Sequence, residues 1–269
     1  MSDAYVHGYD PEENTRLHDQ AHALLDLLHA DTSYPPGSRV LEAACGVGAQ
    51  TVTLVRRSPG AHFTCIDIAE PSLLEARRRT PGTAAFARAD VLAAPFPPAS
   101  FDHAFVCFLL EHLARPVDAL VALGRLVRPG GTITVIEGDH GSAYFHPRSD
   151  SASAAIQALV TLQEQAGGDS LIGRRLYPLL LDAGLEDVRV SPRMVYADAS
   201  RPDLVDGFTR RTFTAMVEGV RRPAVDAGII DAPAFDAGVQ ALHRTAEPDG
   251  VFCYTFFKAV ARTAGVPRP

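Results

Sequence analysis

Residues 39–51 of this chain read Arg-Val-Leu-Glu-Ala-Ala-Cys-Gly-Val-Gly-Ala-Gln-Thr. Val40 and Leu41 begin a short apolar run of the kind that a buried parallel strand needs, and small residues follow it at once. Gly46 and Gly48 tolerate positive φ and let a ligand approach the backbone, while the helix that follows offers unpaired N–H groups. The stretch therefore predicts a strand, a tight turn and a helix, with a polar ligand bound in the turn.

Two cofactor classes use such a turn, and two residues separate them. A dinucleotide fold has a third glycine where the helix packs on the strand, and this chain has Thr51 there. Glu42, at the tip of the strand and four residues before Gly46, would point into the mouth of the site. It would repel a pyrophosphate but suits a ligand with an ammonium and a sulfonium group. An NAD-dependent oxidoreductase is therefore the disfavoured alternative.

The spacing Glu42-x-Ala44-x-Gly46-x-Gly48 resembles motif I of the class I S-adenosylmethionine-dependent methyltransferases, although that family most often has glycine at the position of Ala44. Phe-Asp at 101–102, Leu-Glu-His-Leu at 110–113 and Leu-Val-Arg-Pro-Gly-Gly at 126–131 resemble the same family, in the same order. The arrangement looks most like bacterial small-molecule methyltransferases of quinone and natural-product biosynthesis.

Strands alternate with helices between residues 39 and 137, which is typical of a doubly wound α/β fold with a parallel sheet. The resemblance implies seven strands in the order 3-2-1-4-5-7-6, with strand 7 antiparallel and helices on both faces. After the first strand we expect strands at 62–68, 84–89, 101–108, 132–137, 188–196 and 251–260. We expect helices at 11–30, 48–57, 70–79, 116–127, 151–166, 170–183, 201–220 and 233–246. Pro192 indicates an edge or a bulge in the sixth strand.

Three segments are extra to the alternating pattern: 1–30, 141–168 and 200–247. We interpret residues 1–269 as a single methyltransferase domain in which these segments form a helical lid.

Composition limits the partners. The net charge of −7 and the scattered arginines give no footprint for a nucleic-acid backbone. No apolar run approaches the roughly 20 residues of a membrane span, and the N-terminus lacks signal-peptide features, so we expect a cytoplasmic protein. The four cysteines form no Cys-x-x-Cys pair, which favours free thiols over a disulfide or a metal site. The sequence leaves open whether the chain forms a homo-oligomer.

The cofactor implied by the resemblance is S-adenosyl-L-methionine, with S-adenosyl-L-homocysteine as product. Asp67 lies 21 residues beyond Gly46, at the tip of the neighbouring strand, where a carboxylate can accept both ribose hydroxyls. The family implies an adenine contact at Asp90 and packing by Val91, and related enzymes suggest Tyr9 and Gln20 for the methionine carboxylate. The complete predicted cofactor set is Tyr9, Gln20, Glu42, Ala44, Cys45, Gly46, Gly48, Gln50, Asp67, Ile68, Asp90, Val91, Cys107, Phe108 and His112.

Catalysis at an activated methyl group requires mainly in-line positioning and exclusion of water, and a base only when the nucleophile loses a proton. The candidate bases are His140, in the loop after the fifth strand, His112 and Glu137. Each has a plainer interpretation. His140 is then a solvated loop histidine, His112 a residue that orders the cofactor pocket, and Glu137 a structural helix-end or loop contact.

The acceptor is expected to be a hydrophobic, aromatic small molecule, because aromatic and apolar residues in and beside the extra segments either line a pocket or pack the helices. The residues concerned are Phe145, Ile172, Tyr177, Met194, Tyr196, Phe208, Phe213 and Met216. Methylation at carbon, oxygen or nitrogen stays open. A protein that binds S-adenosylmethionine or a nucleoside without turnover is a further alternative.

Overall fold

The computed structural model describes residues 24–265, and these divide into two compact units. The α/β unit comprises residues 28–137, 172–193 and 257–265, and the helical unit comprises residues 24–27, 138–171 and 194–256. Of the helix expected at 11–30, only the last part is described, as α2 (Leu25–His29). The assignment of a lid remains a prediction.

The seven strands form one sheet in the order β3-β2-β1-β4-β5-β7-β6. β1 pairs in parallel with β2 and β4, β2 with β3, and β4 with β5. β7 runs antiparallel to β5, since Thr263 N donates to Gly131 O while Thr255 N donates to Ser142 Oγ. The predicted sheet is confirmed. Its strands are β1 (Arg39–Ala43), β2 (His62–Asp67), β3 (Ala84–Arg88), β4 (Phe101–Cys107), β5 (Val127–His146), β6 (Glu186–Ala197) and β7 (Val251–Arg262).

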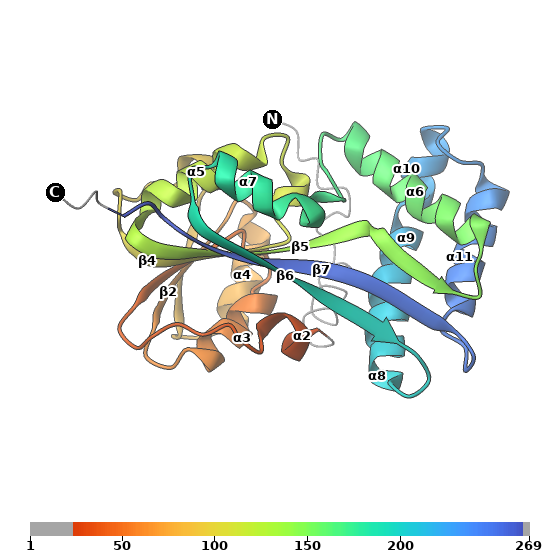
Figure 1. Ribbon diagram of the computed structural model, residues 1–269, viewed down its shortest axis with the longest axis horizontal. Helices are drawn as coiled ribbons and strands as arrows, with labels where there is room; N and C mark the ends of the chain where they lie inside the picture. Colours follow the sequence, from red (N-terminus) through yellow and green to blue (C-terminus); the bar gives the residue numbers. More distant parts are fainter. Residues whose placement is uncertain (1–23, 266–269) are drawn as a thin grey trace. The chain divides into compact units, whose positions relative to one another are not determined.

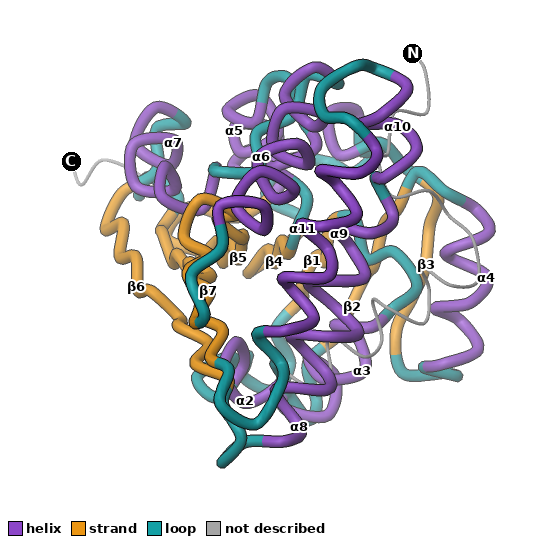
Figure 2. The backbone as a smooth tube through the Cα atoms, turned by 90° about the vertical axis from the view of Figure 1, so that its right-hand side faces the viewer, coloured by secondary structure: helices purple, strands orange, loops and turns teal. Residues whose placement is uncertain are grey.

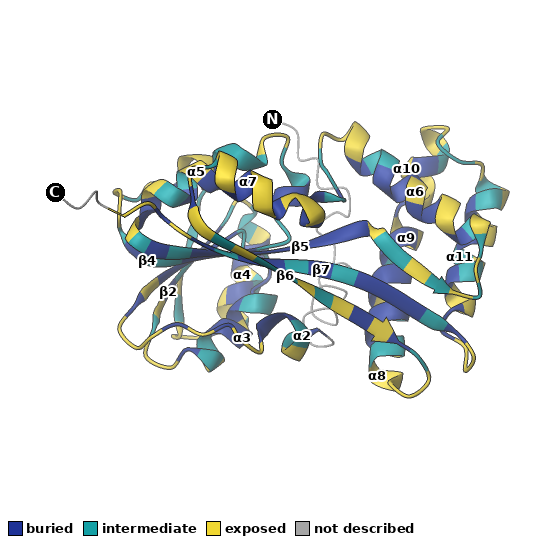
Figure 3. Ribbon diagram, viewed as in Figure 1, coloured by how far each residue is buried: buried dark blue, intermediate teal, exposed yellow. Residues whose placement is uncertain are grey.

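Helices cover both faces of the sheet within the α/β unit (Figure 1). α3 (Ala49–Arg57) and α4 (Glu70–Arg79) lie on one side, and α5 (Pro116–Leu126) and α7 (Leu176–Asp182) on the other. The strands and the inner sides of α5 and α7 are buried, whereas exposed residues gather on the outer sides of these helices (Figure 3). Three short 3-10 helices complete the unit: η1 (Val91–Ala93), η2 (Leu110–His112) and η3 (Ile172–Arg175).

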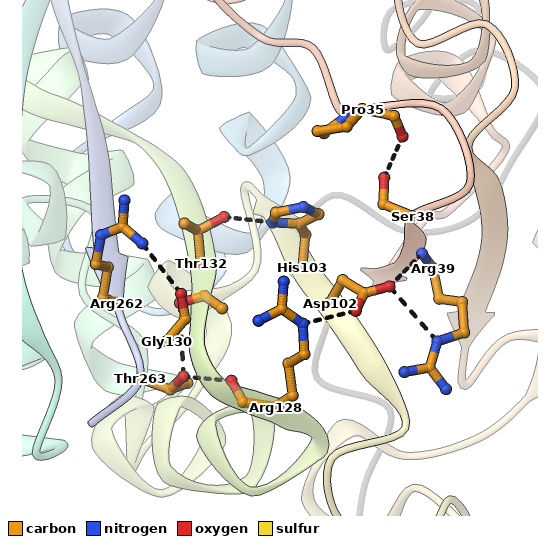
Figure 4. Close-up of polar contacts among 11 residues, drawn as sticks. Pro35, Ser38, Arg39, Asp102, His103, Arg128, Gly130, Thr132, Arg262 and Thr263 are labelled. Atoms are coloured by element: carbon orange, nitrogen blue, oxygen red, sulfur yellow. Dashed lines mark hydrogen bonds and ion pairs between the residues drawn. The ribbon is translucent and has the colours of Figure 1, made fainter. Parts of the chain in front are cut away.

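The family-like Phe-Asp and Pro-Gly-Gly sequences tie together the amino ends of the strands (Figure 4). Asp102 Oδ2 accepts a hydrogen bond from Arg39 N at 2.8 Å, and Oδ1 accepts one from Arg128 Nε at 2.7 Å. A Cβ on Gly131 would lie 2.4 Å from Asp102 O, so only glycine fits there. These two sequences therefore support the sheet, at the end opposite to the carboxyl ends of β1 and β2.

The helical unit contains α6 (Asp150–Gln165), α8 (Pro202–Leu204), the π-helix η4 (Val205–Thr214), α9 (Ala215–Gly219), α10 (Arg221–Asp226) and α11 (Ala232–Arg244). α6 and α11 lie side by side (Figures 1 and 2), at a spacing set by Gly238, whose Cβ would lie 2.6 Å from Ala155 Cβ. The single helix expected at 201–220 is thus α8, η4 and α9. Thr212 Oγ1 donates to the carbonyl of Gly207, five residues earlier, which matches the wider π-helical turn.

Two further expectations differ from the structure, and a third is confirmed. β5 was expected at 132–137 but extends to His146, because Gly138 permits close approach of Tyr254, whose hydroxyl would lie 2.3 Å from a Cβ there. The helix expected at 170–183 begins as the 3-10 turn η3 before α7. β6, which contains Pro192, is the outermost strand, as predicted. Within residues 24–265, no helix is long and apolar enough to cross a membrane.

Candidate cofactor site

The turn after β1 is built from residues in the left-handed region. Ala44 has φ 55°, Gly46 φ 52° and Gly48 φ 76°. A Cβ on Gly48 would lie 2.9 Å from Ala76 Cβ, so this glycine lets α3 begin against α4, whereas the space beside Gly46 is open. The two glycines therefore serve different purposes: Gly48 permits packing, and Gly46 leaves room for a ligand at the backbone.

Asp67 meets this turn from the carboxyl end of β2. Its Oδ2 accepts a hydrogen bond from Gly46 N and its Oδ1 accepts one from Ala69 N, both at 2.8 Å. Burial raises the pKa of the Asp67 carboxyl, against the opposing effect of these backbone hydrogen bonds. The structure thus brings together the glycine turn and the acid that the sequence placed 21 residues apart.

Glu42 is enclosed within the site. It is 2% exposed, and its Oε2 accepts hydrogen bonds from Thr51 Oγ1 at 2.7 Å and Cys65 Sγ at 3.3 Å. Burial raises the pKa of Glu42 to about 7. The carboxyl group of Glu42 is therefore enclosed by residues of α3 and β2, and its place beside a cofactor stays a prediction. Thr51, at the third-glycine position, supplies one of its donors.

The neighbouring strand ends supply the remaining predicted contacts on this side. Ile68 is 55% exposed just beyond β2. Asp90 caps η1 by accepting a hydrogen bond from Leu92 N at 2.9 Å, and Val91 is buried in the core. Ala89 N donates to Asp67 O, so the segment with Asp90 is anchored next to the end of β2.

At the end of β4 the chain turns sharply through Cys107 and Phe108. Phe108 has φ 57°, a conformation that costs energy for an aromatic residue and is concentrated at functional sites. Glu137 holds the following residues: its Oε1 accepts hydrogen bonds from Leu109 N at 3.0 Å and Leu110 N at 2.7 Å. Glu137 is fully buried, and burial raises its pKa well above the ordinary value. These contacts match the plainer, structural interpretation of Glu137.

His112 ends η2 and keeps its imidazole beside Glu111, with Nε2 3.7 Å from Glu111 Oε1. This histidine therefore lies on the turn that Glu137 holds, at the carboxyl end of β4. Its assignment to the cofactor or to catalysis remains a prediction.

Sequence reasoning missed a partner of Gln50. His29, at the end of α2, places Nε2 2.7 Å from Gln50 Oε1 and is 1% exposed. The Gln50 side chain belongs to the first turn of α3, directly after the glycine turn. No sequence signal pointed to His29, because it precedes the strand-turn-helix pattern and belongs to no recognised motif.

In the helical unit, His140 is a buried strand residue and not a loop residue. It lies within β5, is 6% exposed, and its Nδ1 lies 2.8 Å from Tyr254 Oη. The Phe213 ring packs edge-on to it, with centroids 5.9 Å apart. The expectation of a loop position is therefore wrong, since β5 continues past Gly138. Tyr254 on β7, which sequence analysis did not single out, is a polar partner of this histidine.

Phe208 and Phe213 serve the packing of the helical unit. Each is 1% exposed, and both rings contact Phe252 and Tyr254 of β7. Met194 and Tyr196 of β6 are by contrast 52% and 42% exposed. The packing interpretation therefore applies to the two phenylalanines.

Two predicted residues, Tyr9 and Gln20, lie outside the described residues. Among residues 24–265, no group of three or more His, Cys, Asp or Glu side chains is placed to hold a metal ion. The four cysteines are free thiols.

Comparison with known proteins agrees with this geometry. The family model described as a methyltransferase domain matches residues 41–135. A demethylmenaquinone methyltransferase of Thermus thermophilus is 37% identical over 102 residues, which are 37% of this chain and 46% of that protein. An uncharacterized 37.1 kDa protein in transposon TN4556 of Streptomyces fradiae is 33% identical over 200 residues, which are 73% of this chain and 56% of that protein.

The fold has close counterparts among solved structures. The crystal structure of the cyclase SpnF matches with a TM-score of 0.55 at 18% identity, covering 92% of this chain and 82% of that one. Residues 41–135 thus match a methyltransferase domain, and the strand order and the glycine turn agree with the class I S-adenosylmethionine-dependent methyltransferase fold that the sequence predicted. The chain spans about half the length of the two curated relatives described above, 56% and 46%.

Proposed function

We propose that this protein transfers a methyl group from S-adenosylmethionine to a hydrophobic small molecule. The observation that carries the proposal is the hydrogen bond from Gly46 N to Asp67, which joins the glycine turn of β1 to the acid at the end of β2. An open space beside Gly46 and a carboxylate next to it form a cradle for a nucleoside with free ribose hydroxyls.

The residues around the turn suit each part of this cofactor. Asp67 would accept the ribose hydroxyls, Asp90 would accept the adenine amino group, and Ile68 and Val91 would pack on the ring. Glu42 is enclosed, and its hydrogen-bond donors among the described residues, Thr51 and Cys65, are uncharged, so it would favour a positively charged ligand nearby. When bound, S-adenosylmethionine supplies a methyl group already activated by the sulfonium centre.

The acceptor is proposed to be an aromatic molecule such as a quinol, in specialised metabolism. Support comes from the relative named for demethylmenaquinone methylation, which is 37% identical to this chain over 102 residues. If the acceptor must lose a proton, His140 is the first candidate base. A hydrogen bond of 2.8 Å between Nδ1 and Tyr254 Oη orients the His140 imidazole, and an imidazole can serve as a general base. His112 and Glu137 are the further candidates.

Two rival functions differ in their ligands. An NAD-dependent oxidoreductase is disfavoured because Thr51 bonds the enclosed Glu42 where a dinucleotide fold would have glycine. A protein that binds the cofactor without methyl transfer would share the whole site described here.

Calorimetry distinguishes the proposed methyltransferase from an NAD-dependent oxidoreductase. We expect binding of S-adenosylhomocysteine and no binding of NADH; the reverse pattern would contradict the proposal. Transfer of a radiolabelled methyl group from S-adenosylmethionine into an extract of quinols and other aromatic metabolites separates an enzyme from a binding protein. Label in no fraction would favour the binding protein.

Asp67→Ala tests the ribose assignment. We expect it to weaken binding of S-adenosylhomocysteine by about 1.5 to 3 kcal/mol, because charged hydrogen bonds are lost. Asp102→Ala, at the opposite ends of the strands, is the matched control and should leave the affinity unchanged. An unchanged affinity in Asp67→Ala would show that the ribose binds elsewhere.

A further inference from the structure

The hydrogen bond between His29 and Gln50 has a defined direction. Gln50 Oε1 is a carbonyl oxygen and can only accept, so His29 Nε2, at 2.7 Å, carries the proton and donates. His29 is 1% exposed, and burial, the largest effect, lowers its pKa to about 4. The imidazole is therefore neutral near pH 7, with its proton on Nε2.

This contact orients the Gln50 amide. Because Oε1 is occupied by His29, the two N–H groups on Nε2 project away from the histidine. Within residues 24–265, Gln50 Nε2 makes no hydrogen bond, and the side chain is only partly buried. Gln50 also belongs to the first turn of the nine-residue helix α3, where backbone N–H groups favour an anion. Among residues 24–265, the turn thus presents side-chain donors that lack an acceptor.

The segment that carries His29 is firmly anchored. Lys258 on β7 is 2% exposed, and its Nζ donates to Asp31 Oδ1 at 2.6 Å and to Thr32 Oγ1 at 2.5 Å. The His29 ring also packs on Phe105 of β4, with centroids 5.7 Å apart. His29 is therefore held in place independently of Gln50, so the hydrogen bond constrains Gln50 more than it constrains His29.

We propose that His29 is a positioning residue that fixes the Gln50 amide with its N–H donors toward the carboxylate of the methionine part of the cofactor. The inference rests on the proposed function, because it assumes that S-adenosylmethionine binds at the turn. Of the cofactor's groups, only the carboxylate is anionic, and two N–H donors at the start of a helix suit such a group.

Two probes separate the amino-acid end from the nucleoside. S-adenosylhomocysteine carries the carboxylate, whereas 5′-methylthioadenosine keeps the adenosine and the thioether but lacks the amino acid. In Gln50→Met, which keeps the length of the side chain, we expect calorimetry to show about 10- to 100-fold weaker binding of S-adenosylhomocysteine. The affinity for 5′-methylthioadenosine should stay within about twofold, since its groups do not reach Gln50.

Variants of His29 test the positioning role. His29→Leu removes the donor and should weaken S-adenosylhomocysteine binding about 3- to 10-fold, whereas His29→Gln, whose amide nitrogen can take the place of Nε2, should recover most of it. Gln50→Glu can still accept from His29 but has no donors and carries a negative charge, so it should bind at least as weakly as Gln50→Met. In the Gln50→Met background, His29→Leu should cost nothing further.

If Gln50→Met lost affinity equally for both probes, or bound S-adenosylhomocysteine as the wild type does, the inference about Gln50 and His29 would be overturned but the proposed function would not. A wild-type protein that binds neither probe would instead overturn the proposed function. Gln50 is partly exposed on α3, so its variants should keep the wild-type melting temperature. This holds even if the variants of the buried His29 have a lower melting temperature.

Discussion

At the scale of single residues, the two carboxyl groups of the site are held in different ways. Asp67 is bonded by backbone N–H groups of the turn, whereas Glu42 is bonded by the side chains of Thr51 and Cys65. Burial raises the pKa of both. Around Glu42 the titratable groups of the described residues are Asp67, Cys45, Cys65, Cys107 and Tyr34, none of which carries a positive charge.

Glu42 should make stability depend on pH. The pKa of Glu42 is about 7 in the folded protein and 4.5 for an ordinary glutamate. Its stabilising contribution is therefore fully present below pH 4.5 and is lost as the pH rises through 7, by about 3 kcal/mol. The side chain of Glu42→Gln cannot ionise. Urea unfolding should therefore show that the free energy of unfolding of the variant, relative to that of the wild type, rises by about 3 kcal/mol between pH 5 and pH 8. Parallel pH profiles of the two proteins would contradict the buried, neutral carboxyl.

The two glycines of the turn should respond differently to alanine. Gly46→Ala places a methyl group in open space at positive φ and should cost only about 1 kcal/mol of unfolding free energy. Gly48→Ala adds a clash with Ala76 and should cost about 2 to 4 kcal/mol. Despite its smaller effect on stability, Gly46→Ala should weaken S-adenosylhomocysteine binding, as measured by calorimetry. Equal destabilisation by both would contradict these roles.

Ala44 shows what the sequence could and could not predict at this scale. Its φ of 55° explains why related proteins prefer glycine there, and the small side chain explains why alanine is tolerated. The turn and Asp67 were predictable, because spacing along the chain determines which strand ends meet. His29 and Tyr254 were not, since their roles depend on contacts with Gln50 and His140 that no local pattern encodes.

At the scale of elements, the turn between β4 and η2 depends on Glu137. Glu137→Gln keeps an acceptor oxygen for Leu109 N and Leu110 N, and should change the free energy of unfolding by less than about 1 kcal/mol. Glu137→Ala leaves both N–H groups without their acceptor and should cost about 2 to 4 kcal/mol in denaturant unfolding. If Glu137 were the base, Glu137→Gln would stay folded but lose methyl transfer. Equal loss of stability in both variants would contradict the holding role.

The elements also show where local patterns fail. The helix at 70–79 was predicted to the residue, because Glu70 and Pro71 mark its start. β5 and the 201–220 segment were not: the fifth strand was expected to end at Glu137, and 201–220 was expected as a single α-helix. In the fold, Gly138 leaves room for Tyr254, and the carbonyl of Gly207 accepts a hydrogen bond from Thr212 inside a π-helix. Tertiary contacts decided these two elements.

At the scale of the whole molecule, local sequence patterns predict the elements of the α/β unit better than those of the helical unit. The α/β unit follows a repeated strand-helix alternation with its turn residues at regular intervals, and its sheet order agrees with the family. The helical unit has no such repeat, and α10 was not predicted at all. β5, β6 and β7 each contribute residues to both units.

Cofactor binding should stabilise the whole protein. Free S-adenosylhomocysteine at 100 times its dissociation constant should add about 2.7 kcal/mol and raise the melting temperature by roughly 5 to 10 °C. NADH at the same concentration should produce no shift. Differential scanning fluorimetry of the wild type and Asp67→Ala checks this, because the variant should lose most of the shift at that concentration. A shift of equal size in Asp67→Ala would contradict the ribose assignment.

The π-helix η4 limits where insertions and deletions can occur in this chain. Phe208 and Phe213 both reach the rings of β7 because they lie five residues apart on a helix with the wider turn. Deleting one residue between them would bring them into α-helical spacing and turn every later side chain by about 100°. Homologous proteins that keep these two phenylalanines should therefore keep the spacing between them, and length variation should fall in the segments before 202 and after 219.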